Sequence, residues 1–229
     1  MVEQVLSQSA QAGAAENGPS FPDVAAPVRA PQPARAHRAQ VDDYVARLQR
    51  ALAALPRDQL TEVGEALLTA YRNDKQVFTI GNGGSSSTAS HMAADLAKNT
   101  IGPNLKRFRV TSLADNASII TALANDLGYE NVFCEQLMNV ICAGDVLIVI
   151  SASGNSPNVL KAIRYARLQS AETIALLGFD GGEAARLVDI PIVVRSGDYG
   201  IIEDVHLAVN HMLVEFLKEH LAESRPWVA

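Results

Sequence analysis

Short apolar runs alternate with longer segments in which apolar residues recur at helical spacing, from about residue 38 to the end of the chain. The runs predict strands near 77–80, 108–112, 146–150, 173–177 and 190–194. The periodic segments predict helices near 41–52, 57–73, 85–96, 118–124, 132–141, 157–168, 183–187 and 201–221. Strands that alternate with helices favour an α/β fold, here one domain with a parallel five-stranded sheet flanked by helices on both faces.

The first 36 residues have a different composition. They are rich in Ala, Pro, Ser, Gln and Gly, with five prolines between residues 19 and 33 and no sustained apolar period. Such a segment buries too little surface to offset its ordering entropy. We therefore expect a disordered N-terminal tail over 1–36 and a folded domain over 37–229.

Composition excludes several classes of function. The formal net charge of the 229 residues is −6. The chain therefore lacks the excess of positive charge that is typical of nucleic-acid-binding proteins. No apolar run approaches the ~18 residues of a membrane span, and the N-terminus lacks the pattern of a signal peptide. The cysteines, Cys134 and Cys142, lie outside any ligand or redox motif, and we expect two buried thiols in a cytoplasmic protein.

Two loops have the composition of phosphate-binding loops. Residues 81–87 (GNGGSSS) follow the first expected strand, and residues 151–156 (SASGNS) follow the third. Both lead into expected helices, and backbone N–H groups, hydroxyls and the positive end of a helix dipole together suit a phosphate. Because the ligand of a parallel sheet lies beyond the carboxyl ends of its strands, the two loops indicate a small phosphorylated substrate.

Four side chains on two helices form a candidate metal site. His91 and Asp95 are four residues apart, and Glu203 and His211 are eight apart, which is about 80° beyond whole helical turns. Two imidazoles and two carboxylates are ligands that zinc accepts. Spacing alone also permits simple surface pairs, in which both carboxylates bind nearby basic side chains.

From about residue 38 to 222 the chain resembles the sugar isomerase (SIS) fold, and within it the phosphoheptose isomerases. The matching segments are GNGGSSSTASHMAADL, ANDLGYENVF, GDVLIVISASGNSPNVLKAI, LLGFDGGEAARLVDIPI and EDVHLAVNHMLVEFL. The resemblance implies an aldose–ketose isomerase that converts sedoheptulose 7-phosphate to a heptose 7-phosphate through an enediolate. It also implies one zinc ion per subunit and a homotetramer.

Carried over residue by residue, the resemblance assigns roles to individual positions. The metal ligands are His91, Asp95, Glu203 and His211, and the catalytic residues are Asp95, Glu203 and His211. The substrate-binding residues are Asn82, Gly83, Gly84, Ser85, Asp95, Asn125, Asp126, Ser151, Ala152, Ser153, Ser156 and Glu203.

This chain departs from the family pattern at three of these positions. The family usually has Glu where Asp95 stands and Gln where Glu203 stands, and many members carry a hydroxyl where Ala152 stands. Either carboxylate could therefore be the base that takes the carbon proton. Two alternatives stay open beside the heptose phosphate isomerase: an isomerase of another phosphosugar, and a non-catalytic protein that binds a phosphosugar or a partner.

Overall fold

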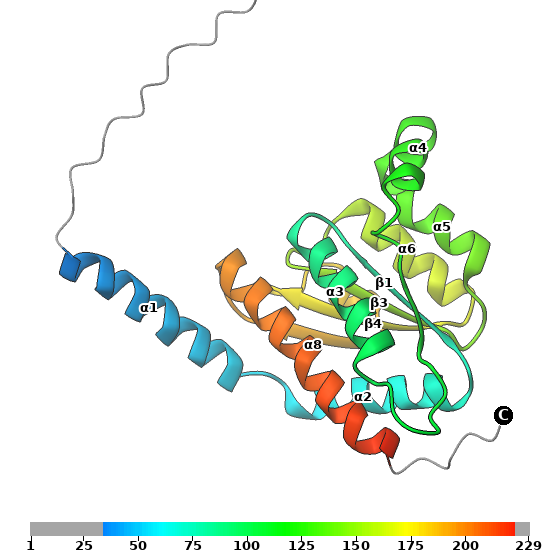
Figure 1. Cartoon of the computed structure of the whole chain (residues 1–229). Coiled ribbons are helices and arrows are strands. Elements are labelled where there is room, and N and C mark those ends of the chain that lie inside the picture. Colours follow the sequence, from blue (N-terminus) through cyan, green and yellow to red (C-terminus); the bar gives the residue numbers. More distant parts are fainter. Residues whose placement is uncertain (1–33, 223–229) are drawn as a thin grey trace, which may run out of the picture. The chain divides into compact units, whose positions relative to one another are not determined.

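The computed structural model describes residues 34–222, with side chains from 37 to 221 (Figure 1). Residues 1–33 of the expected disordered tail lie outside the described residues, and residues 34–36, which we also expected in the tail, are instead the first residues of helix α1 (Ala34–Ala53).

Every strand and helix expected from the sequence is present. The strands are β1 (Gln76–Gly81), β2 (Arg109–Ser112), β3 (Val146–Ser151), β4 (Glu172–Gly178) and β5 (Ile190–Val194). The helices after α1 are α2 (Arg57–Arg72), α3 (Gly84–Lys98), α4 (Ala117–Leu127), α5 (Val132–Val140), α6 (Pro157–Leu168), α7 (Ala184–Leu187) and α8 (Tyr199–Ala222). One element was not expected, the short 3-10 helix η1 (Tyr129–Asn131).

The five strands form one parallel sheet in the order β2-β1-β3-β4-β5, which confirms the predicted α/β architecture. The chain leaves β1 toward β2 at one edge and then returns to β3 on the other side of β1. Strand order thus reverses between β1 and β3, whose ends lie together because Gly81 pairs with Ile150. Ligands of such sheets bind at this reversal, and both glycine- and serine-rich loops begin there.

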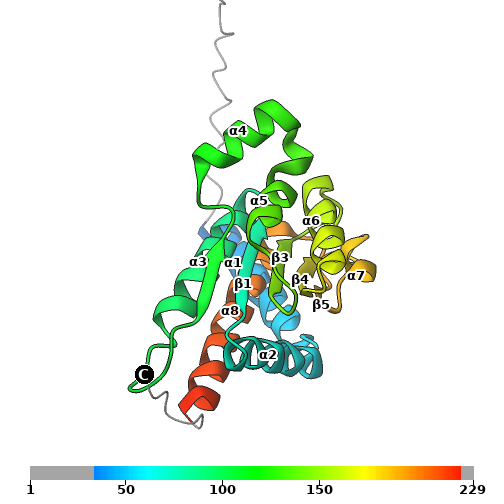
Figure 2. The same cartoon turned by 90° about the vertical axis from the view of Figure 1, so that its right-hand side faces the viewer.

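Alternate residues of each central strand pack on opposite faces of the sheet. In β3, Ile148 and Ile150 contact the cluster formed with α2, α3 and α8, whereas Leu147 and Val149 contact the cluster formed with α5, α6 and α7. Figure 2 shows α3 and α8 on one side of the strands and α6 and α7 on the other. Burial on both faces explains why β3 is an uninterrupted apolar run.

Helix α4 packs only loosely against the rest of the domain. None of its residues is buried, and Figures 1 and 2 both show it standing apart from the sheet. Among the described helices, none is long and apolar enough to cross a membrane.

One expectation about the cysteines was wrong. Cys134 is buried on α5, but Cys142 is exposed, because it follows the end of α5 in the turn that leads to β3. Both thiols are free.

Candidate active site

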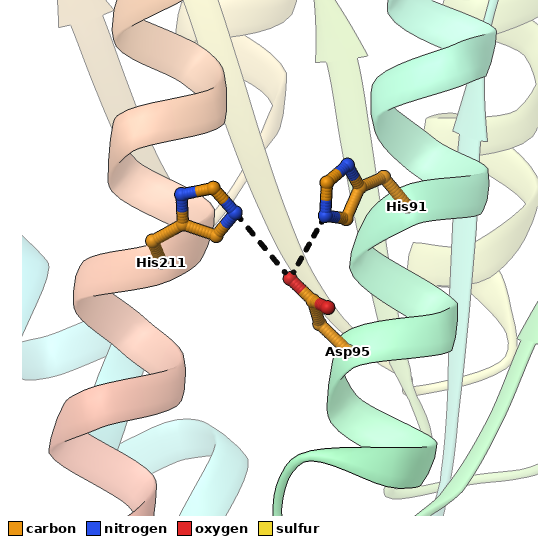
Figure 3. A group of neighbouring side chains, drawn as sticks. All are labelled: His91, Asp95 and His211. Carbon is orange, nitrogen blue, oxygen red and sulfur yellow. Dashed lines mark ion pairs between the residues drawn. The ribbon is translucent and has the colours of Figure 1, made fainter.

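Helices α3 and α8 pack against each other and bring together three of the four predicted metal ligands. The Nε2 atom of His91 lies 3.2 Å from Oδ2 of Asp95, and Nε2 of His211 lies 3.6 Å from the same oxygen. Figure 3 shows both imidazoles directed at this one carboxylate oxygen. The Asp95 side chain is 13% exposed, whereas the histidines are about half exposed, so the group opens to solvent on the imidazole side.

The donor atoms of this group fit a zinc ion. They all lie within 4.8 Å of one another. Zinc bonds of about 2.0–2.1 Å in a tetrahedral arrangement place neighbouring donors about 3.3 Å apart, close to the two distances at Asp95. Each histidine offers Nε2 to the group, as a neutral imidazole ligand would.

Two asparagines that the sequence interpretation missed hold Asp95. Nδ2 of Asn210 donates to Oδ2 at 2.8 Å, and Nδ2 of Asn99 donates to Oδ1 at 2.8 Å. Asn210 is fully buried on α8, and Asn99 follows the last turn of α3. Asn210 stands among the buried apolar residues Val205, Val209 and Leu213, and a polar residue at such a position was the sequence signal that could have revealed it.

The fourth expected ligand, Glu203, lies elsewhere in the site. Its carboxylate contacts the start of α3, where a Cβ on Gly84 would lie 2.6 Å from Oε1. A side chain at position 84 would therefore displace the Glu203 carboxylate from this position. The carboxylate lies at the positive end of the α3 dipole and is not part of the group formed by His91, Asp95 and His211.

The second loop presents its serines at the start of α6. The hydroxyl of Ser151 accepts the N–H of Gly154, and that of Ser153 accepts the N–H of Asn155, which shapes the loop as a tight turn. Ser156 is the N-cap residue, but its side chain makes no hydrogen bond to the first turn of α6. Its hydroxyl is therefore available to an anion at this helix end. Ala152 is buried and contributes its carbonyl to the N–H of Gly178.

A pair of amides joins the first loop to the start of α6. Asn82 of the first loop and Asn158 of α6 exchange two hydrogen bonds of 2.9 Å each. The hydroxyl of Tyr129, on the unexpected helix η1, donates to Oδ1 of the same Asn82 at 2.9 Å. Asn158 and Tyr129 were not singled out from the sequence, because their partners are 76 and 47 residues away.

The remaining predicted substrate residues divide into two groups. Gly83 is the N-cap of α3 and Ser85 is buried in its first turn, so both belong to the first loop. Asn125 and Asp126 lie on the exposed end of α4, where the amide of Asn125 donates to the carboxylate of Asp126 at 2.8 Å. The structure pairs these two with each other and not with the cluster on α3 and α8.

His206, between Glu203 and His211 on α8, is a core residue. It is fully buried, and its Nε2 contacts the carbonyl of Leu177 at 3.1 Å. Burial lowers the pKa of His206 to about 4, although the hydrogen bond to Leu177 acts in the opposite direction. The imidazole is thus neutral near pH 7, with Nε2 protonated as the donor to Leu177.

This pKa predicts a loss of stability in mild acid. The pKa of a histidine in the unfolded chain is near 6.5. Between pH 6.5 and 4, His206 is therefore protonated in the unfolded chain and neutral in the folded one. The contribution of neutral His206 to the free energy of unfolding is fully present above pH 6.5. Acidification from pH 7 to 5 should lower the free energy of unfolding by about 2 kcal/mol through this residue. Urea unfolding of chelator-treated protein at both pH values measures it. The variant His206→Met should lose less stability than wild type over this interval, and equal losses would contradict the assignment.

Comparison with known proteins identifies the class. The family model described as SIS domain matches residues 42–178. The chain therefore belongs to the SIS domain family.

Within that family the similarity is to phosphoheptose isomerases, as the sequence motifs predicted. The phosphoheptose isomerase of Trichlorobacter lovleyi is 35% identical over 189 residues, which cover 80% of this chain and 92% of the relative. That of Helicobacter pylori strain Shi470 is 37% identical over 175 residues, covering 76% and 90%. The solved structure of the phosphoheptose isomerase from Neisseria gonorrhoeae superposes with a TM-score of 0.72 at 29% identity, covering 81% of this chain and 98% of that one.

Proposed function

We propose that this protein is an aldose–ketose isomerase that converts D-sedoheptulose 7-phosphate to D-glycero-D-manno-heptose 7-phosphate. The observation that carries the proposal is the position of the His91–Asp95–His211 group, two of whose members lie on α3, the helix that begins at the first glycine-rich loop. A cluster able to hold a metal thereby shares an element with a loop able to hold the substrate. The similarity to relatives named phosphoheptose isomerase supports an isomerase of a heptose phosphate.

His91, Asp95 and His211 would hold one zinc ion per subunit. When bound, zinc supplies a Lewis acid that polarises the substrate carbonyl and stabilises the negative oxygen of an enediolate. Two imidazole nitrogens and one carboxylate are donor types that zinc accepts.

Glu203 is the better candidate for the base that removes the carbon proton. Asp95 is engaged by two amides and two imidazoles, whereas the carboxylate of Glu203 accepts no hydrogen bond from the part of the chain that the structure describes. Glu203 would take the proton from C1 of the ketose as the C1–C2 double bond forms and would return it to C2. The accompanying transfer of a proton from O1 to O2 completes the conversion without net gain or loss of electrons.

The phosphate belongs to the second loop. The carboxylate of Glu203 lies at the start of α3 and would repel an anion there. The start of α6 carries the free hydroxyl of Ser156 beside Ser151 and Ser153. We therefore assign the phosphate to this loop and the sugar to the space between it and α3, bordered by the Asn82–Asn158 pair.

We also propose that the enzyme is a cytoplasmic homotetramer. Exposed apolar side chains lie on α1 at Val41 (62% exposed) and Val45 (46%) and on α5 at Met138 and Val140. Burial of such residues between subunits would stabilise an assembly. Light scattering at micromolar concentration should give four times the mass of 24.4 kDa, and a monomer would contradict the proposal.

A substrate panel tests the proposed reaction against its nearest alternative. Purified full-length protein with zinc should turn over sedoheptulose 7-phosphate faster than pentose and hexose ketose phosphates. Preference for one of the shorter sugars would assign the enzyme to another phosphosugar. No turnover of any sugar phosphate by the zinc-loaded protein would favour a binding protein.

A further inference from the structure

Asn210 has an unusual environment for a core residue. It is fully buried on α8 among apolar side chains, and its Oδ1 has no hydrogen-bond donor among the described residues. The orientation of the amide follows from its partner, because a carboxylate oxygen can only accept and Nδ2 must therefore face Asp95. A buried acceptor without a partner loses its hydrogen bonds to water and destabilises the folded chain. An apolar residue would avoid that cost, so packing alone does not explain an asparagine here.

Both oxygens of the Asp95 carboxylate accept a hydrogen bond from an asparagine amide. Asn99 binds Oδ1, and Asn210 occupies one lone pair of Oδ2. The same Oδ2 also lies 3.2 Å from Nε2 of His91 and 3.6 Å from Nε2 of His211, and Figure 3 shows both imidazoles directed at it. An aspartate has few rotamers, and two donors from different helices leave its carboxylate one orientation.

We propose that Asn210 is the positioning residue of the metal site: it orients the Asp95 carboxylate so that Oδ2 can bind a divalent ion together with His91 and His211. This inference rests on the proposed metal site and extends it from three ligands to the buried amide behind them. Residues that orient metal ligands typically contribute 10–100-fold to metal affinity. The buried amide of Asn210 therefore contributes to metal affinity, although it is not itself a ligand.

Zinc affinity of the full-length protein, measured by competition with a chromophoric chelator, tests this role. Asn210→Leu keeps the side chain's size and removes both the donor and the unpaired Oδ1. The dissociation constant for zinc should rise about 10–100-fold. The thermal midpoint of the metal-free Asn210→Leu protein should change no more than that of the control variant Gln136→Met. Asn210→Ala, which deletes the same amide without refilling its space, carries the same expectation for zinc.

The control and a double mutant separate positioning from general destabilisation. Gln136→Met removes another buried amide, which donates to the carbonyls of Leu113 and Val132 on the opposite face of the sheet, and should leave zinc affinity unchanged. In an Asp95→Ala background, Asn210→Leu should cause no further loss of affinity, because Asn210 acts only through Asp95.

The outcomes distinguish this inference from the proposed function. If wild type binds zinc and Asn210→Leu binds it equally tightly, the positioning role alone is wrong. If Asn210→Leu lowers zinc affinity equally in the wild-type and Asp95→Ala backgrounds, the positioning role is also wrong. A wild-type protein that binds no zinc would overturn the metal site and the positioning role together.

Discussion

Replacing His211 by alanine is expected to lower kcat for sedoheptulose 7-phosphate by about 10²–10⁴-fold. The side chain contributes Nε2 to the group around Oδ2 of Asp95, and its loss removes one of the three metal ligands that we propose on α3 and α8. Because the side chain is 55% exposed, the free energy of unfolding of the metal-free protein should change by no more than about 0.5 kcal/mol. Steady-state kinetics and urea unfolding measure the two effects separately.

His220→Ala is the matched control for this variant. His220 lies in the last turn of the same helix and interacts with the carbonyl and ring of Phe216, away from Asp95. Its replacement should leave kcat unchanged. A His211→Ala enzyme that keeps more than a third of wild-type turnover would show that the α3–α8 group does not take part in the reaction.

The double variant Ser153→Ala, Ser156→Ala is expected to raise KM more than it lowers kcat. Both hydroxyls lie in the loop before α6, where we place the phosphate, remote from the reacting end of the sugar. Each charge-assisted hydrogen bond is worth about 1.5–3 kcal/mol, so two lost bonds should lower kcat/KM by about 10²–10⁴-fold.

Inhibition by inorganic phosphate provides an independent measure of the same site. The double variant should lose this inhibition, whereas Ser118→Ala, an exposed serine at the start of α4, should keep both KM and inhibition unchanged. An unchanged KM in the double variant would place the phosphate elsewhere, with the first loop as the remaining candidate.

The strands and helices could be predicted because each has a strong local pattern. The run 146–150 is apolar throughout because β3 is covered on both faces, and Pro157 marks the first turn of α6. The position of the site followed from topology, since both loops leave adjacent strands at the same edge of a parallel sheet. The pairing of His91 with Asp95 followed from their spacing on one helix.

The parts of the site that depend on contacts between distant segments could not be predicted. A spacing of eight residues places Glu203 and His211 on related faces of α8, but also about 12 Å apart along its axis. That spacing does not say whether Glu203 extends toward His211 or across to Gly84, and the structure shows the second arrangement. Likewise, the bonds of Asn210 to Asp95 and of Tyr129 to Asn82 join segments 115 and 47 residues apart, for which the sequence contains no local pattern.

One measurement tests the proposed reaction and its metal together. Purified full-length protein is incubated with sedoheptulose 7-phosphate, and formation of the heptose 7-phosphate is followed by NMR before chelation, after removal of metal by a chelator, and after addition of zinc. We predict conversion by the metal-loaded protein, its loss after chelation, and its recovery with one zinc ion per subunit. No conversion by the zinc-loaded protein would contradict the proposed function, and conversion that a chelator leaves intact would contradict the metal's part in it.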